Sequence, residues 1–234
     1  ITKLSNLKQI VVRPTSAVLR YSDPNQDSLV AGREQGVDAL LEGRVQKSAD
    51  GIRLTVQLVR VRDGVLLWGD EFDGNLGNTF AIQDSISRQV AQALRLRLSG
   101  QEQQRLANRY TADIEAYQHY LQGRYFWNKR SKEGLEKALT YFELAISRDH
   151  NYALAYSGLA DSYFVLGFKE WLAPEEAFKR ATSAAVEALR IDDNIAEAHT
   201  SLAAIKDLYD RDLDGAEIEY KRAIEIDPNY STAH

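Results

Sequence analysis

Residues 153–163, ALAYSGLADSY, and residues 181–188, ATSAAVEA, decide the fold of the second half of this 234-residue chain. An alanine followed by tyrosine or histidine recurs at intervals of 39, 43 and 35 residues, in Ala116-Tyr117, Ala155-Tyr156, Ala198-His199 and Ala233-His234. A second pattern of small and aromatic residues travels with it, in Ala138-Phe142-Ala145, Ala181-Ala185-Ala188 and Ala216-Tyr220-Ala223. Such spacing predicts stacked helix pairs, because no single pair can bury its apolar face alone.

The repeated segments resemble tetratricopeptide repeats. The second unit shows the pattern best, with Tyr156, Leu159, Ala160 and Tyr163 on its first helix and the alanines of residues 181–188 on its second. The units run longer than the roughly 34 residues of that family. The resemblance implies an all-α helical-repeat domain, an α-solenoid, over residues 111–234. We expect about three units, 114–152, 153–195 and 196–230, followed by the start of a fourth.

The first half predicts a separate α/β domain over residues 1–110. Asp-Gly pairs at 50–51 and 63–64 separate three β-rich runs, 40–46, 52–62 and 65–72, which is a strong hairpin signal. They predict a three-stranded antiparallel meander. The apolar alternation slips at Leu58-Val59, which indicates either a bulge or burial on both faces there. Helices are expected at 27–35, ended by Gly36, and at 78–98. An apolar run at 9–13, taken as a further strand, makes the expected sheet a mixed one covered by helices.

Four segments of this half occur in an order that is similar to a known domain. They are LEGRV at 41–45, LTVQL at 54–58, LWGDEFD at 67–73 and FAIQD at 80–84. The half resembles the domain, akin to the N-terminal domain of TolB, that precedes tetratricopeptide repeats in bacterial regulators. In that family it often follows a winged-helix DNA-binding domain of the CadC or ToxR type, a protein kinase or a nucleotide cyclase. Family members usually begin with an earlier strand and helix. Residues 1–7 resemble the end of that helix, so the resemblance implies that the first strand is missing or was cut away.

Composition excludes several classes of site. The chain has no cysteine, which rules out disulfides, thiolate zinc sites and cysteine nucleophiles. No apolar run approaches the roughly 20 residues of a membrane-spanning helix, so we expect no membrane insertion by this chain. The net charge of −5 divides into +3 over residues 1–110 and −8 over residues 111–234. The acidic second half argues against direct binding of nucleic acid.

The sequence indicates no catalytic, cofactor-binding or metal site. The chain contains no GxGxxG loop, no phosphate-binding GxxxxGK loop and no HExxH motif. Asp70 and Glu71 are adjacent on an expected strand and therefore project to opposite faces. The acidic run 207–214 lacks the glycine and glutamate of a calcium loop and is interpreted as an inter-helix turn. His199 is interpreted as a packing residue of the array. The basic-aromatic run 124–132 could grip single-stranded nucleic acid or a phosphorylated peptide. The packing interpretation is preferred, in which residues 125–127 end the first helix of unit one and the charges lie in its turn to the next helix.

The concave surface formed by the first helix of each repeat is the remaining candidate site. The resemblance implies a peptide-binding groove there, lined by Gln118, Gln122, Tyr125, Ser157, Asp161, Phe164, Glu197, Thr200 and Ala204. This mixture of polar and aromatic side chains suits an extended peptide or another helix. We therefore expect a protein or peptide partner, with self-association as a further mode.

Together these observations favour a non-enzymatic function, as a protein-interaction scaffold in a bacterial regulatory or signalling protein. A partner that prefers one arrangement of the two domains would bias an attached output domain. Two alternatives stay open: an accessory region of a larger enzyme, such as a nucleotide cyclase or protein kinase, and a small-ligand sensor that uses the meander sheet. The compartment also stays open, cytoplasmic or, with a membrane helix upstream, periplasmic.

Overall fold

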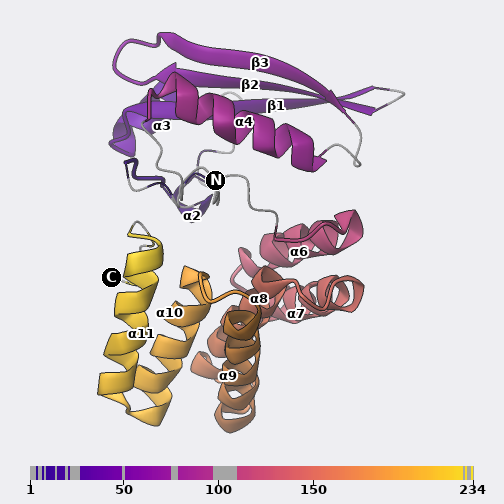
Figure 1. Ribbon diagram of the computed structural model, residues 1–234, viewed down its shortest axis with the longest axis vertical. Coiled ribbons are helices and arrows are strands. Elements are labelled where there is room, and N and C mark those ends of the chain that lie inside the picture. The colour runs from indigo at the N-terminus through magenta and orange to yellow at the C-terminus, as the bar shows by residue number, and fades with distance from the viewer. Residues whose placement is uncertain are drawn as a thin grey trace. The chain divides into compact units, whose positions relative to one another are not determined.

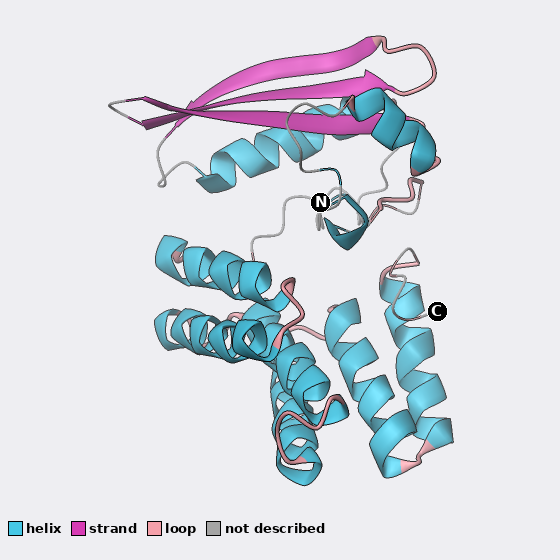
Figure 2. Cartoon of the chain, turned by 180° about the vertical axis from the view of Figure 1, so that it is seen from behind, coloured by secondary structure: helices cyan, strands magenta, loops and turns pink. Residues whose placement is uncertain are grey.

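The structure is a computed structural model of the chain (Figure 1). It describes residues 4, 7, 9–13, 15–18, 21, 27–48, 51–74, 79–96, 110–228, 230 and 233. The chain divides into two compact units, residues 1–108 and residues 109–234. The first unit holds a small sheet with helices, and the second is built from helices (Figure 2). The predicted order, an α/β part followed by a helical part, is confirmed.

The helices of the second unit pack as consecutive pairs. They are α6 (Ile114–Trp127), α7 (Lys132–Arg148), α8 (Ala153–Phe168), α9 (Pro174–Ile191), α10 (Ala196–Ile205) and α11 (Leu213–Ile226), with a π-helical turn η3 (Lys206–Asp210) after α10. α6 packs on α7, α8 on α9 and α10 on α11, and each pair also contacts the next. Helix pairs thus occupy the repeated segments, while the assignment to an α-solenoid stays a prediction.

Capping residues determine where several of these helices begin. The side chains of Asp113, Ser131 and Asp212 accept hydrogen bonds from backbone N–H groups in the first turns of α6, α7 and α11. Such caps satisfy donors that have no partner inside the helix. Pro174 opens α9 instead, at a position where the missing N–H removes no intrahelical bond.

Small residues allow the helices to approach closely around Phe142. This side chain lies on α7 and is fully buried. Gly123 of α6 and Gly158 of α8 face its ring, and a Cβ atom built on either glycine would lie 2.5 Å from a ring carbon. Ala138 and Ala145, which belong to the repeated pattern, are also fully buried. The Phe142 ring therefore occupies space that the two glycines leave open.

The first unit is built on an antiparallel sheet with the strand order β1-β2-β3. Its elements are α2 (Thr15–Val18), α3 (Ser28–Glu34), β1 (Ala39–Ser48), β2 (Gly51–Arg60), β3 (Leu66–Gly74) and α4 (Thr79–Ala93). The β2–β3 register shifts between Leu58 and Val59, at the position where the sequence alternation slips. The β2–β3 connection passes through Gly64, whose φ of +69° is a conformation that glycine adopts at low cost.

Helix α4 packs against one face of this sheet (Figure 1). Leu58 of β2 and Val90 of α4 belong to the same buried cluster. Trp68 of β3 donates a hydrogen bond from Nε1 to Oε1 of Gln89 on α4, at 2.9 Å. Arg53 of β2, whose side chain alternates to the other face, is exposed. One face of the sheet is therefore covered and the other is exposed to solvent, as the alternation of residue types predicts.

Two expectations for this unit are wrong. Residues 10–13 form no strand, so the described sheet is antiparallel and not mixed. Ile10 and Val12 instead pack against the buried cluster beneath α4, a burial that a short apolar run permits without strand pairing. The helix expected over 78–98 covers Thr79–Ala93, because Arg95 adopts a positive φ of +54° just beyond it. The expected helix end at 99–100 and the first hairpin turn at 49–50 lie outside the described residues.

Candidate functional site

The helices α6, α8 and α10, which are the first members of their pairs, carry a polar cluster. We use the name inner cluster for Arg124 of α6, Asp161 of α8, and Glu197 and Ser201 of α10. Arg124 Nη1 lies 3.7 Å from Asp161 Oδ2. The Ser201 hydroxyl donates a hydrogen bond to Asp161 Oδ1. These contacts join α6, α8 and α10 through the carboxylate of Asp161. The Asp161 side chain is only 12% exposed, so the contacts are largely shielded from solvent.

Burial dominates the electrostatics of the inner cluster. It raises the pKa of the Asp161 carboxyl above its ordinary value, while Arg124 and the hydrogen bond from Ser201 oppose the rise. It also raises the pKa of the Glu197 carboxyl, to which the nearby charge of Asp161 adds. Burial therefore disfavours the charged forms of both carboxyls, whereas the positive charge of Arg124 favours them.

The nine residues predicted for the groove fall in different environments. Gln122 and Tyr125 are exposed, Gln118, Asp161, Phe164, Glu197 and Ala204 are half-buried, and Ser157 and Thr200 are buried. The Thr200 hydroxyl donates to the Ala196 carbonyl of its own helix at 2.9 Å. The Phe164 ring packs against Phe178 of α9. Of the nine, Asp161 and Glu197 belong to the inner cluster, whereas Ser157, Thr200 and Phe164 are covered by neighbouring parts of the array.

Sequence reasoning missed Arg124 and Ser201 as partners of Asp161. The repeat pattern marks neither position, and Arg124 lies in a run interpreted as packing. A signal was nevertheless present, because Ser201 follows Glu197 by four residues and so shares its helix face. Opposite charges on corresponding faces of successive first helices would have indicated the contact.

The basic residues at the end of α6 are engaged by aromatic rings. The guanidinium of Arg130 lies 3.5 Å from the centre of the Trp127 ring, and that of Arg124 lies 4.7 Å from it. Lys129 Nζ lies 4.8 Å from the centre of the Tyr125 ring. Cation–π contacts of this kind are attractive. Lys129 and Arg130 lie in the connection after α6, as the sequence predicts, whereas Arg124 lies within α6.

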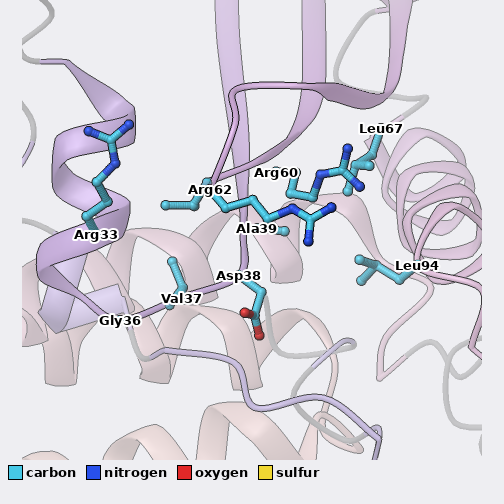
Figure 3. Close-up of a pocket in the computed structure, with 10 residues that line it drawn as sticks. Arg33, Gly36, Val37, Asp38, Ala39, Arg60, Arg62, Leu67 and Leu94 are labelled. Atoms are coloured by element: carbon cyan, nitrogen blue, oxygen red, sulfur yellow. The ribbon is translucent and has the colours of Figure 1, made fainter.

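A cavity of about 520 Å³ lies within the first unit (Figure 3). It is lined by Arg33, Gly36, Val37, Asp38, Ala39, Arg60, Val61, Arg62, Leu67 and Leu94. Arg60 and Arg62 both form ion pairs with Asp63, at 2.8 and 3.3 Å, which offset part of their positive charge. The volume is within the range of small-ligand pockets. Its charged lining consists of Arg33, Arg60, Arg62 and Asp38.

Two interpretations of polar residues are confirmed by contacts. Asp70 accepts a hydrogen bond from Gln89 of α4 at 3.1 Å, whereas Glu71 faces Thr55 on the opposite side of the sheet. His199 is buried between α10 and α11, with Nδ1 2.7 Å from Oε2 of Glu219.

Two general features concern the part of the chain that the structure describes. Within it, no three His, Asp or Glu side chains gather into a group that could hold a metal ion. None of its helices combines the length and the hydropathy that crossing a bilayer requires.

Sequence similarity to a known protein indicates a class of function for this chain. No family model matches the chain. Over 204 residues, or 87% of the chain, it is 29% identical to a protein of Rhizobium meliloti (strain 1021) named "Putative adenylate cyclase 3". The chain spans 35% of that relative's length, or about a third of a longer polypeptide.

This similarity overturns the expectation of a non-enzymatic scaffold. A relative named as a cyclase points to an enzyme, and it agrees better with the alternative of a region within a larger nucleotide cyclase. The error has a physical cause. Helical repeats and a small sheet are recognised by packing patterns, and packing patterns carry no information about the chemistry of the polypeptide to which they belong.

Proposed function

We propose that this chain is a regulatory region of a nucleotide cyclase, an enzyme that converts a nucleoside triphosphate into a cyclic nucleotide and pyrophosphate. The observation that carries the proposal is the 29% identity to the Rhizobium meliloti protein, which extends over both units of the chain. The chain corresponds to 35% of that relative, so the proposal assigns to it one part of a cyclase polypeptide.

Within this proposal the second unit is a tetratricopeptide-type array, and the first is a domain of the TolB N-terminal type. Support for the array comes from the helix pairs at the repeated segments and from the close approach of Gly123 and Gly158 to Phe142. Support for the first domain comes from the three-stranded meander followed by α4. These are elements in the order that the resemblance implies.

The inner cluster is the proposed coupling element of the region. Asp161 contacts side chains from α6 and α10, so a change in the spacing of these helices alters its contacts and its exposure to water. Separating a largely buried carboxylate from its ionic partner is strongly destabilising. Any ligand that prefers one spacing would shift the population of array arrangements and, through it, cyclase output.

The test uses the natural full-length polypeptide that contains this chain. Purified protein is supplied with ATP and Mg²⁺ or Mn²⁺, and cyclic AMP is measured by chromatography. Three forms are compared: the wild type, Asp161→Asn, which keeps the shape but removes the ionisable carboxyl opposite Arg124, and Asp210→Asn. The last is the matched control, because Asp210 is exposed in the π-helical turn. Circular dichroism establishes that each form is folded.

We expect the wild type to form cyclic AMP, Asp161→Asn to change the rate at least threefold, and Asp210→Asn to leave it unchanged. A wild-type polypeptide that forms no cyclic nucleotide from ATP or GTP would overturn the assignment to a cyclase. Equal rates in all three folded forms would retain the cyclase and refute the inner cluster as its coupling element.

A further inference from the structure

A second polar network lies inside the α10–α11 pair and shares no residue with the inner cluster (Figure 1). His199 of α10 is only 5% exposed, and both nitrogens of its ring face oxygen atoms. Nδ1 lies 2.7 Å from Oε2 of Glu219 on α11. Nε2 lies 3.2 Å from the backbone carbonyl oxygen of Asp193, in the connection between α9 and α10. The ring therefore joins α10 to the helix that follows it and to the connection that precedes it.

Both of these oxygens can only accept hydrogen bonds. A backbone carbonyl has no proton to donate, and a carboxyl group has none while it is ionised. Burial raises the pKa of the Glu219 carboxyl, but the hydrogen bonds from His199 and Lys206 outweigh burial and hold the pKa below its ordinary value. Glu219 is therefore a carboxylate near neutral pH. A neutral imidazole has one N–H group and one bare nitrogen, so it would satisfy only one of the two acceptors.

We propose that His199 is held as the doubly protonated imidazolium, and that its second proton fastens the α10–α11 pair in a pH-dependent way. With both nitrogens protonated, the ring donates to Glu219 and to Asp193 at once. When a proton is lost, a lone pair of nitrogen faces a lone pair of oxygen in a place that is shielded from water, which is destabilising. This inference is independent of the proposed cyclase function.

The charged groups that face this network come from α11, η3 and the connection before α10. Lys206 Nζ lies 3.0 Å from Oε1 of Glu219, so the lysine and His199 use different oxygens of one carboxylate. The lysine charge opposes a second proton on the ring, whereas the Glu219 charge favours it. The Asp193 carboxylate, 3.6 Å from Nε2, also favours it, but this side chain is exposed and is shared with Arg222 at 3.3 Å. Glu219 is the closer and the more buried of the two carboxylates, and therefore has the larger effect.

The second proton links the stability of the helix pair to pH. In the unfolded chain the ring meets water in place of two fixed acceptors, so the folded chain binds the proton more tightly. The stabilisation is therefore complete in mild acid and is lost as the pH rises. Histidine side chains change their charge between about pH 5 and pH 8, which places the loss near physiological pH.

The test uses the 234-residue chain with nitrogen-15 in its histidine rings, observed by nuclear magnetic resonance at pH 7.5. The His199 signals are assigned through their bonds to the backbone, so the measurement on the wild type needs no variant. Glu219→Gln removes the buried carboxylate. Glu217→Gln, on an exposed position of the same helix, is the matched control. Thermal unfolding of the wild type and of His199→Gln is followed by circular dichroism at pH 6.0 and pH 8.5.

We expect both nitrogens of His199 to be protonated in the wild type and in Glu217→Gln, and one nitrogen to be bare in Glu219→Gln. The midpoint of thermal unfolding should exceed that of His199→Gln by about 3 °C more at pH 6.0 than at pH 8.5. A neutral His199 ring in the wild type would overturn the inference, as would a midpoint difference that is the same at both pH values. An imidazolium that persists in folded Glu219→Gln would refute the role of this carboxylate in holding the proton.

Discussion

Replacing Gly158 by alanine tests the packing around Phe142. The added Cβ atom would lie 2.5, 2.6 and 2.8 Å from three carbons of the Phe142 ring, and this ring is fully buried. Overpacking of a core costs about 1–3 kcal/mol. Exchanging glycine for alanine inside a helix gains about 0.5–1 kcal/mol. The steric cost exceeds the helical gain, so we expect the free energy of unfolding to fall by roughly 0.5–2 kcal/mol.

The assay is urea unfolding followed by far-ultraviolet circular dichroism, which reports mainly on the helical unit. A double-mutant cycle with Phe142→Leu isolates the contact, because the smaller side chain makes room for the new methyl group. We expect the two changes to be coupled by at least about 1 kcal/mol in favour of the double variant. The reasoning is refuted if Gly158→Ala stabilises the chain, as it would in an open helix, or if the cycle shows no coupling.

Three further predictions concern caps and turns. Ser131→Ala removes the cap of α7 and lowers the free energy of unfolding in urea by about 1 kcal/mol, whereas Ser147→Ala, exposed on the same helix, changes it by less than about 0.5 kcal/mol. Gly64→Ala places an alanine in a left-handed conformation at φ +69°, which lowers the free energy of unfolding by about 1–2 kcal/mol. Gly69→Ala, where φ is not positive, has a smaller effect, and thermal unfolding compares the two variants. The pKa of the Asp113 carboxyl is lowered by the backbone hydrogen bond it accepts as a cap, so its contribution is present above the ordinary value of 3.8 and is lost as the pH falls through the lowered pKa. The stability advantage of the wild type over Asp113→Asn should therefore shrink between pH 5 and pH 2; a constant difference would contradict this assignment.

The parts of the fold that could be predicted are those with local signals. The Asp63-Gly64 pair indicates a tight turn by itself, and the slip at Leu58-Val59 is visible in the alternation of residue types. Residues 9–13 could not be assigned in this way, because a strand exists only where a partner strand lies beside it. Helix α4 ends just before Arg95, which has a positive φ. An arginine at this position does not indicate a helix end, as a glycine would.

The candidate site was predictable only in part, for a related reason. Asp161 and Glu197 could be assigned to the expected groove through the resemblance to tetratricopeptide repeats. Their contacts with Arg124 and Ser201 arise where three helices meet, and such contacts are set by tertiary packing. The link to a cyclase could not be derived from residues that serve packing, and it required similarity to a longer protein.

The three tryptophans are divided between the two units, with Trp68 on β3 and Trp127 and Trp171 in the helical unit. The indole of Trp68 is hydrogen-bonded to Gln89, whereas the N–H of Trp127 is buried without a hydrogen-bond partner among the described residues. The chain thus carries its own fluorophores in both halves. Chains that retain one tryptophan at a time would show from emission alone whether sheet and helices melt in one transition or in two.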